Sequence, residues 1–304
     1  MRFLIAFTVL FLTSLGDEQG RCDSSQARIQ EREVQLKMTL KIEVVGHINS
    51  LRLRMVVPAT INGKQRVEDL SFSVQPDSFY TVGNNSYVLF RFFDLEKDFK
   101  IVLKGKLFIY NSISLKTNSD GLYLANYLVS EPNIEASSEK IIAVAQQLKR
   151  KTDIETVVET FEYVKQHISY EKNPAIGAEK VLESGVGKCM DYSDLFVALL
   201  RANGIPAKSV FGIVVHEVSA NPLHAWSEAY LKQQGWVRFD PTAGHSDIRK
   251  DGANYKMRIS NKYVTLSEGR NDPEMRASLY RYNYRYAGTA GSVKVKRSIE
   301  IRGQ

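Results

Sequence analysis

The fold is decided by residues 185–206, which read GVGKCMDYSDLFVALLRANGIP. Across 190–203 apolar side chains recur on nearly every face, which predicts a helix that runs through the protein core. Gly204 favours the left-handed conformation that ends a helix, and Pro206 prevents the helix from continuing. Cys189 is therefore expected at the start of a buried helix.

The position of Cys189 has two interpretations. Unpaired backbone N–H groups and the helix dipole favour an anion at a helix start, so a thiol there loses its proton more readily than a free one. The flanking Gly185 and Gly187 keep the approach free of side chains. A small buried apolar residue is the alternative, since free cysteines are commonly buried. Position alone does not decide between the two.

Two downstream motifs favour the nucleophile. The chain reads HAW at 224–226 and FDPT at 239–242, so cysteine, histidine and aspartate follow one another in that order. A thiolate, an imidazole and an orienting carboxylate are the parts of a cysteine nucleophile site. A lone histidine in a strand is more often structural, but the set of three with Cys189 indicates catalysis.

The segments that carry this histidine and aspartate are predicted to form a hairpin. Residues 223–231 and 235–242 alternate in character and are separated by a short turn that contains glycine. If Tyr230 lies opposite Trp236, the histidine and the aspartate become diagonal neighbours on one face of the sheet. A slip of one residue would place them on opposite faces.

Together these motifs resemble the transglutaminase-like superfamily, over about residues 135–250. The resemblance implies an α+β fold with a papain-like core in which Cys189 is the nucleophile, His224 the base and Asp240 the residue that orients the base. It also implies acyl-enzyme chemistry, in which the thiolate attacks an amide carbonyl and water or an amine resolves the thioester. Besides the Cys189 N–H, Tyr170 is our candidate oxyanion donor. A core aromatic is the alternative for that tyrosine.

The resemblance leaves hydrolysis and cross-linking open, because both use the same triad. We expect a cysteine peptidase or amidase that acts on protein or peptide substrates, since no acidic cluster resembles a calcium site and water is the abundant acceptor. A non-catalytic binding module on the same scaffold is the alternative from another class. With two cysteines and scattered histidines, neither a metal nor a cofactor is expected.

The N-terminus indicates secretion. The apolar run at 3–12 follows a basic residue and precedes small residues, which predicts a signal peptide at 1–16 and a flexible leader at 17–32. The run is too short to span a membrane. Arg21 precedes Cys22 where a lipoprotein signal needs a small residue, so we expect a periplasmic or extracellular protein without a lipid anchor.

The remaining segments are predicted to be β-structure. Alternating runs between marked turns predict a β-sandwich domain at 33–128. After the core, a C-terminal extension at 251–304 is predicted to carry a β-hairpin from 279–286 and 292–301. These two runs contribute to the net charge of +7 and mix basic with aromatic residues. Secretion argues against nucleic acid as a partner, while association with anionic cell-surface polymers stays open.

Overall fold

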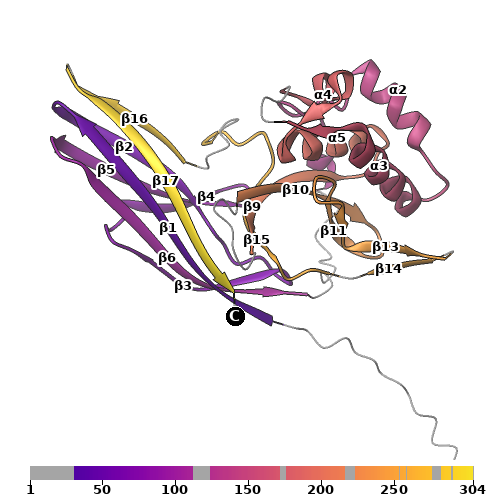
Figure 1. Ribbon diagram of the computed structural model, residues 1–304, viewed down its shortest axis with the longest axis horizontal. Coiled ribbons are helices and arrows are strands. Elements are labelled where there is room, and N and C mark those ends of the chain that lie inside the picture. Colours follow the sequence, from indigo (N-terminus) through magenta and orange to yellow (C-terminus); the bar gives the residue numbers. More distant parts are fainter. Residues whose placement is uncertain are drawn as a thin grey trace, which may run out of the picture.

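A computed structural model describes residues 31–111, 124–171, 176–215, 223–252, 254–257, 259–275, 282–288 and 290–303. The predicted signal peptide and Cys22 lie outside these residues. Figure 1 shows a β-sandwich beside a separate sheet that carries the helices. The architecture is α+β, as the sequence predicts. Within the described ranges, no helix has the length and apolar character needed to cross a bilayer.

Two antiparallel four-stranded sheets form the sandwich, with the strand orders β17-β1-β6-β3 and β16-β2-β5-β4. Alternate side chains of these strands point inward and form one shared core, as expected for facing sheets. The prediction that this region is rich in β-strands is confirmed. Their bounds are β1 (Glu31–Val45), β2 (Ile48–Val57), β3 (Gln65–Phe72), β4 (Ser78–Val82), β5 (Asn85–Leu95) and β6 (Phe99–Tyr110).

The C-terminal strands correct the predicted hairpin. β16 (Tyr282–Ala287) pairs with β2, whereas β17 (Ser292–Gly303) pairs with β1 in the other sheet. The connection between them therefore crosses from one sheet to the other. It packs so closely that a Cβ on Gly291 would lie 2.6 Å from the His47 carbonyl oxygen. Alternation correctly indicated two strands, but it carries no information about their partners.

The core has a five-stranded antiparallel sheet of order β12-β11-β10-β9-β15, with helices on the side away from the sandwich (Figure 1). Its last strand lies beyond residue 250, the predicted end of the core. The sheet strands are β9 (Ala207–Val214), β10 (Leu223–Leu231), β11 (Gly235–Asp240), β12 (His245–Ser246) and β15 (Tyr263–Glu268). Two short two-stranded sheets complete the β-structure: β7 (Ser169–Tyr170) with β8 (Val186–Gly187), and β13 (Ile248–Asp251) with β14 (Asn254–Met257).

The helices of the described residues precede the core sheet in the chain. They are η1 (Ala125–Tyr127), α2 (Glu139–Leu148), α3 (Asp153–His167), α4 (Ala178–Ser184) and α5 (Cys189–Ala202). A capping box starts α3: Glu155 N–H donates to Thr152 Oγ1 at 3.3 Å, and Thr152 N–H donates to Glu155 Oε2 at 3.0 Å. α5 is buried over most of its length and ends before Gly204 in the left-handed conformation (φ +79°). It packs against β9 and β10 and so holds the first residue of the helix beside the sheet.

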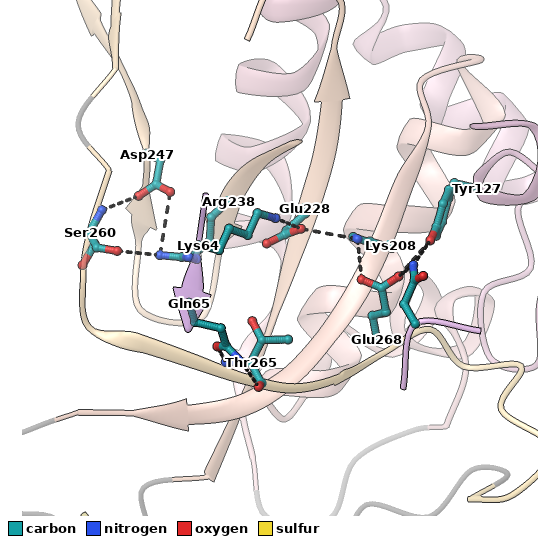
Figure 2. Close-up of polar contacts among 11 residues, drawn as sticks. Lys64, Gln65, Tyr127, Lys208, Glu228, Arg238, Asp247, Ser260, Thr265 and Glu268 are labelled. Atoms are coloured by element: carbon teal, nitrogen blue, oxygen red, sulfur yellow. Dashed lines mark hydrogen bonds and ion pairs between the residues drawn. The ribbon is translucent and has the colours of Figure 1, made fainter. Parts of the chain in front are cut away.

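The sandwich and the core sheet share a hydrophobic core and a buried charged network. Ile213 and Val264 of the core sheet pack within the sandwich interior. Figure 2 shows the network, in which Lys64 Nζ lies 2.5 Å from Glu228 Oε2 on β10. Lys208 Nζ lies 3.7 Å from the same oxygen. The network thus joins a sandwich turn to the strand that carries His224.

Candidate active site

Cys189 is the first residue of α5 and is partly exposed. Lys188 precedes it in extended conformation, and the Lys188 N–H donates to Asp191 Oδ2 at 2.8 Å. A Cβ on Gly187 would lie 2.6 Å from the Asp191 Cβ, so the turn into the helix requires a glycine there. The backbone at the helix start is therefore held in one conformation, with the thiol at the N-terminal end of a buried helix.

His224 lies on β10 and joins the thiol to a buried carboxylate. Its Nε2 lies 2.6 Å from Asp240 Oδ2, and the Cys189 side chain lies close enough to the imidazole to influence its pKa. Because Asp240 occupies Nε2, Nδ1 is left for the thiol. Burial favours the neutral ring, but the interactions with Asp240 and Cys189 outweigh burial and raise the pKa of His224 to about 10. This environment favours an imidazolium at neutral pH.

The strand register that brings these residues together is the predicted one. Tyr230 lies opposite Trp236, and the pairing runs on to Ser227 opposite Phe239. Asp240 follows at the end of β11 and pairs in turn with His245 of β12. The structure thus brings the histidine into contact with the aspartate and places Cys189 near the imidazole. Their catalytic roles stay predictions.

Tyr170 lies beside the nucleophile. The parallel pairing of β7 with β8 places it opposite Gly187, two residues before Cys189. Tyr170 is 60% exposed, so it is not a core aromatic, which was the alternative interpretation. Partial burial, together with the charge of Cys189, raises the pKa of Tyr170, so its hydroxyl stays protonated and can donate a hydrogen bond.

Two hydrogen-bond donors that hold Asp240 lie outside the three motifs. Tyr263 on β15 donates its hydroxyl to Asp240 Oδ2 at 3.0 Å, and the Ala243 N–H donates to Oδ1 at 3.1 Å. The carboxylate is 1% exposed and has both oxygens engaged. No local signal marks Tyr263, because it lies outside the segment that resembles the family. Only the pairing of β15 with β9 brings it to the site.

Other polar residues near the motifs stabilise the scaffold. Arg201 is buried, lies 2.7 Å from Glu131 Oε1 and donates to the Ala207 carbonyl at 2.8 Å. Ser193 of α5 donates to the Trp226 carbonyl at 2.7 Å and so ties the helix to β10. In the part of the chain that the structure describes, no group of three or more His, Cys, Asp or Glu side chains is arranged to hold a metal ion.

Comparisons with known proteins concern mainly the core of the chain. Residues 142–241 match the profile of the Transglutaminase-like superfamily. The chain contains a transglutaminase-like core. Over 101 residues it is 34% identical to the uncharacterised protein YebA of Bacillus subtilis, a match that covers 29% of this chain and 14% of YebA. Over 87 residues it is 36% identical to a protein-glutamine gamma-glutamyltransferase of Pseudomonas aeruginosa, covering 23% of this chain and 13% of that protein. The chain therefore spans a small part of these relatives.

The likeness in fold extends beyond the transglutaminase-like core. A crystal structure of a candidate cysteine protease from Cytophaga hutchinsonii superposes with a TM-score of 0.66 at 16% identity. The match covers 90% of this chain and 92% of that one, so it includes the sandwich as well as the core. At this level of identity the likeness concerns the fold.

Proposed function

We propose that this protein is a thiol enzyme that hydrolyses amide bonds of proteins or peptides through a thioester at Cys189. One observation carries the proposal: a partly exposed thiol at the start of a buried helix lies beside an imidazole that a buried carboxylate holds. Helix start, base and orienting group are the parts that activate a cysteine nucleophile. We further propose, from residues 1–16, that the reaction takes place outside the cytoplasm.

In the proposed mechanism each group has one role. The Cys189 thiolate attacks the amide carbonyl carbon, and the electron pair of the C=O bond moves to oxygen. The Cys189 N–H and the Tyr170 hydroxyl stabilise that oxyanion. His224, as the imidazolium, then protonates the leaving amine while the C–N bond breaks. In the second half, His224 takes a proton from water as the water attacks the thioester. The C–S bond then breaks, which releases the carboxylic acid and returns the Cys189 thiolate beside the imidazolium. Asp240 keeps the ring oriented throughout.

Transamidation is the second candidate. It is favoured by the likeness to the Pseudomonas aeruginosa protein named as a protein-glutamine gamma-glutamyltransferase. In that reaction an amine replaces water in the second half. The exposure of Tyr170 supports water as the acceptor, because an amine competes with water only where a site excludes it.

The test is to incubate the protein with a peptide library and a labelled primary amine and to identify the products by mass spectrometry. We expect cleaved or deamidated peptides without incorporated amine, and no products from Cys189→Ala. Dominant incorporation of the amine would assign the protein to transamidation. No turnover, together with an unreactive Cys189, would favour a non-catalytic binding module.

A further inference from the structure

Tyr263 engages the same carboxylate oxygen that holds the histidine. Its hydroxyl donates to Asp240 Oδ2 at 3.0 Å, and His224 Nε2 lies 2.6 Å from that oxygen. Since the Ala243 N–H occupies Oδ1, both oxygens of the carboxylate are engaged and its rotation about the side chain is restricted. A carboxylate held in this way presents Oδ2 to the imidazole in one direction.

The ring of Tyr263 is itself held on several sides. It packs edge-on against Trp226, with ring centroids 4.9 Å apart, and the Arg238 guanidinium lies 4.4 Å from its centroid. Its strand also approaches β9 very closely: a Cβ on Gly212 would lie 2.0 Å from the Val264 carbonyl oxygen. Tyr263 is 7% exposed. The hydroxyl therefore has little freedom to move away from Asp240.

The sandwich contributes to the position of this strand. β15 is an edge strand of the core sheet, and its register shifts between Thr265 and Ser267. Gln65 is the first residue of β3 and is 1% exposed. At the register shift its side-chain amide replaces the backbone hydrogen bonds that a neighbouring strand would make. Its Oε1 accepts the Thr265 N–H at 2.8 Å, and its Nε2 donates to the Thr265 carbonyl at 2.9 Å (Figure 2). Both backbone groups at the irregularity are thereby paired.

We propose that Tyr263 is a positioning residue of the active site, which orients Asp240 toward His224, and that Gln65 of the sandwich holds the strand that carries Tyr263. This inference rests on the proposed function. It assigns the sandwich a part in the geometry of the site, and it extends the site to a residue beyond the three motifs.

The ionisable groups around this contact come from several elements. On the side of the nucleophile are Cys189 and Tyr170. On the other side, the strands next to Tyr263 contribute Arg238, His245, whose ring stacks at 5.8 Å, and Asp247. Removal of the Tyr263 hydroxyl leaves all of these in place, so a change in the reactivity of Cys189 reports on the contact with Asp240.

The test measures the rate at which iodoacetamide alkylates Cys189 as a function of pH, with the labelled peptide identified by mass spectrometry. Tyr263→Phe removes the hydroxyl alone. We expect alkylation at neutral pH to slow about tenfold, the amount that one hydrogen bond to a charged group can account for. The rise in rate should also move to higher pH, because a loosely held carboxylate stabilises the imidazolium less.

Tyr87→Phe is the matched control, because the Tyr87 hydroxyl donates to another buried carboxylate, that of Asp272. That variant should lose some stability yet keep the pH profile of the wild type. Gln65→Met, which does not touch Asp240, should shift the profile in the same direction as Tyr263→Phe, by about threefold in rate.

The outcomes separate the two proposals. The wild-type thiol can react readily while the pH profiles of Tyr263→Phe and Gln65→Met superpose on the wild-type profile. In that case the positioning role is wrong and the proposed function stands. If the wild-type Cys189 reacts no faster than a free thiol, the proposed function fails, and the positioning role fails with it.

Discussion

Two charged sites lie on the same strand, β10, and differ in what they can do. At its start, His224 contacts Asp240 and lies beside Cys189, with 18% of the histidine side chain exposed. Further along, Glu228 meets Lys64 and Lys208 with 3% of its side chain exposed (Figure 2). Both sites combine burial with charged hydrogen bonds. Only the first leaves a nucleophile within reach of solvent.

The comparison separates two uses of a buried charge. At Glu228, burial favours the neutral acid, but Lys64 and Lys208 outweigh burial and lower the pKa of Glu228 to about 2. The carboxylate therefore stays ionised and joins the sandwich to the core. At His224, similar forces favour the charged ring beside a thiol, where the proton can be transferred to a substrate. The access of solvent to a nucleophile, rather than the presence of charge, distinguishes the proposed catalytic end of the strand.

The largest effect is expected from Asp240→Asn. The amide keeps the shape of the side chain and can still accept from Tyr263, so the fold should remain intact. The imidazole loses the charge that orients and stabilises it, and turnover should fall by about 10⁴-fold, by analogy with serine triads. Peptide hydrolysis and thermal unfolding, measured on the same sample, check both parts. Near-full activity would show that Asp240 is structural.

At the other end of the strand, Glu228→Gln should affect stability instead of reactivity. It leaves Lys64 and Lys208 buried without their shared carboxylate, which typically costs about 3–5 kcal/mol in the free energy of unfolding. Denaturant unfolding measures the loss, and alkylation of Cys189 in the folded protein should be unchanged.

The matched control for Glu228→Gln is Glu300→Gln. Glu300 pairs with Lys37 at 2.7 Å on the surface, where an ion pair contributes roughly 0–1 kcal/mol. Equal losses in the two variants would contradict the stabilising role of the buried network.

The same network predicts a dependence of stability on pH. The pKa of Glu228 is lowered from 4.5 to about 2 by folding, so its contribution is present above about pH 4.5 and is lost as the pH falls toward 2. The shift corresponds to a loss on the order of 3 kcal/mol. Urea unfolding across this range should show a steeper acid dependence in the wild type than in Glu228→Gln. Parallel curves would mean that Glu228 does not contribute.

A smaller loss of activity than that of Asp240→Asn is expected from Tyr170→Phe, which leaves the triad intact. If the hydroxyl stabilises the oxyanion, kcat should fall by roughly a hundredfold with little change in KM. Tyr163→Phe is the control, because Tyr163 stacks on His167 of α3. A change in kcat of less than about twofold for Tyr170→Phe would show that Tyr170 is not part of the oxyanion hole.

Local signals account for the elements that carry the nucleophile, the base and the orienting residue. The nearly all-apolar run of α5, with Gly204 after it, predicted a buried helix. Alternation and a short turn predicted the register of β10 and β11. In each case the interacting residues lie close together in the chain, so periodicity and turn chemistry were sufficient.

By itself, the sequence therefore determined the helix that begins at Cys189, the pairing of β10 with β11, the presence of two C-terminal strands and the order of the three motif residues. The tertiary structure decided the partners of the C-terminal strands, the contact of Tyr263 with Asp240, and the pairing of Gln65 with Thr265. The last of these joins residues 200 positions apart. Alternation is a local property that marks a strand, whereas its partner is set by which edge remains open and which faces must be buried when the two sheets close.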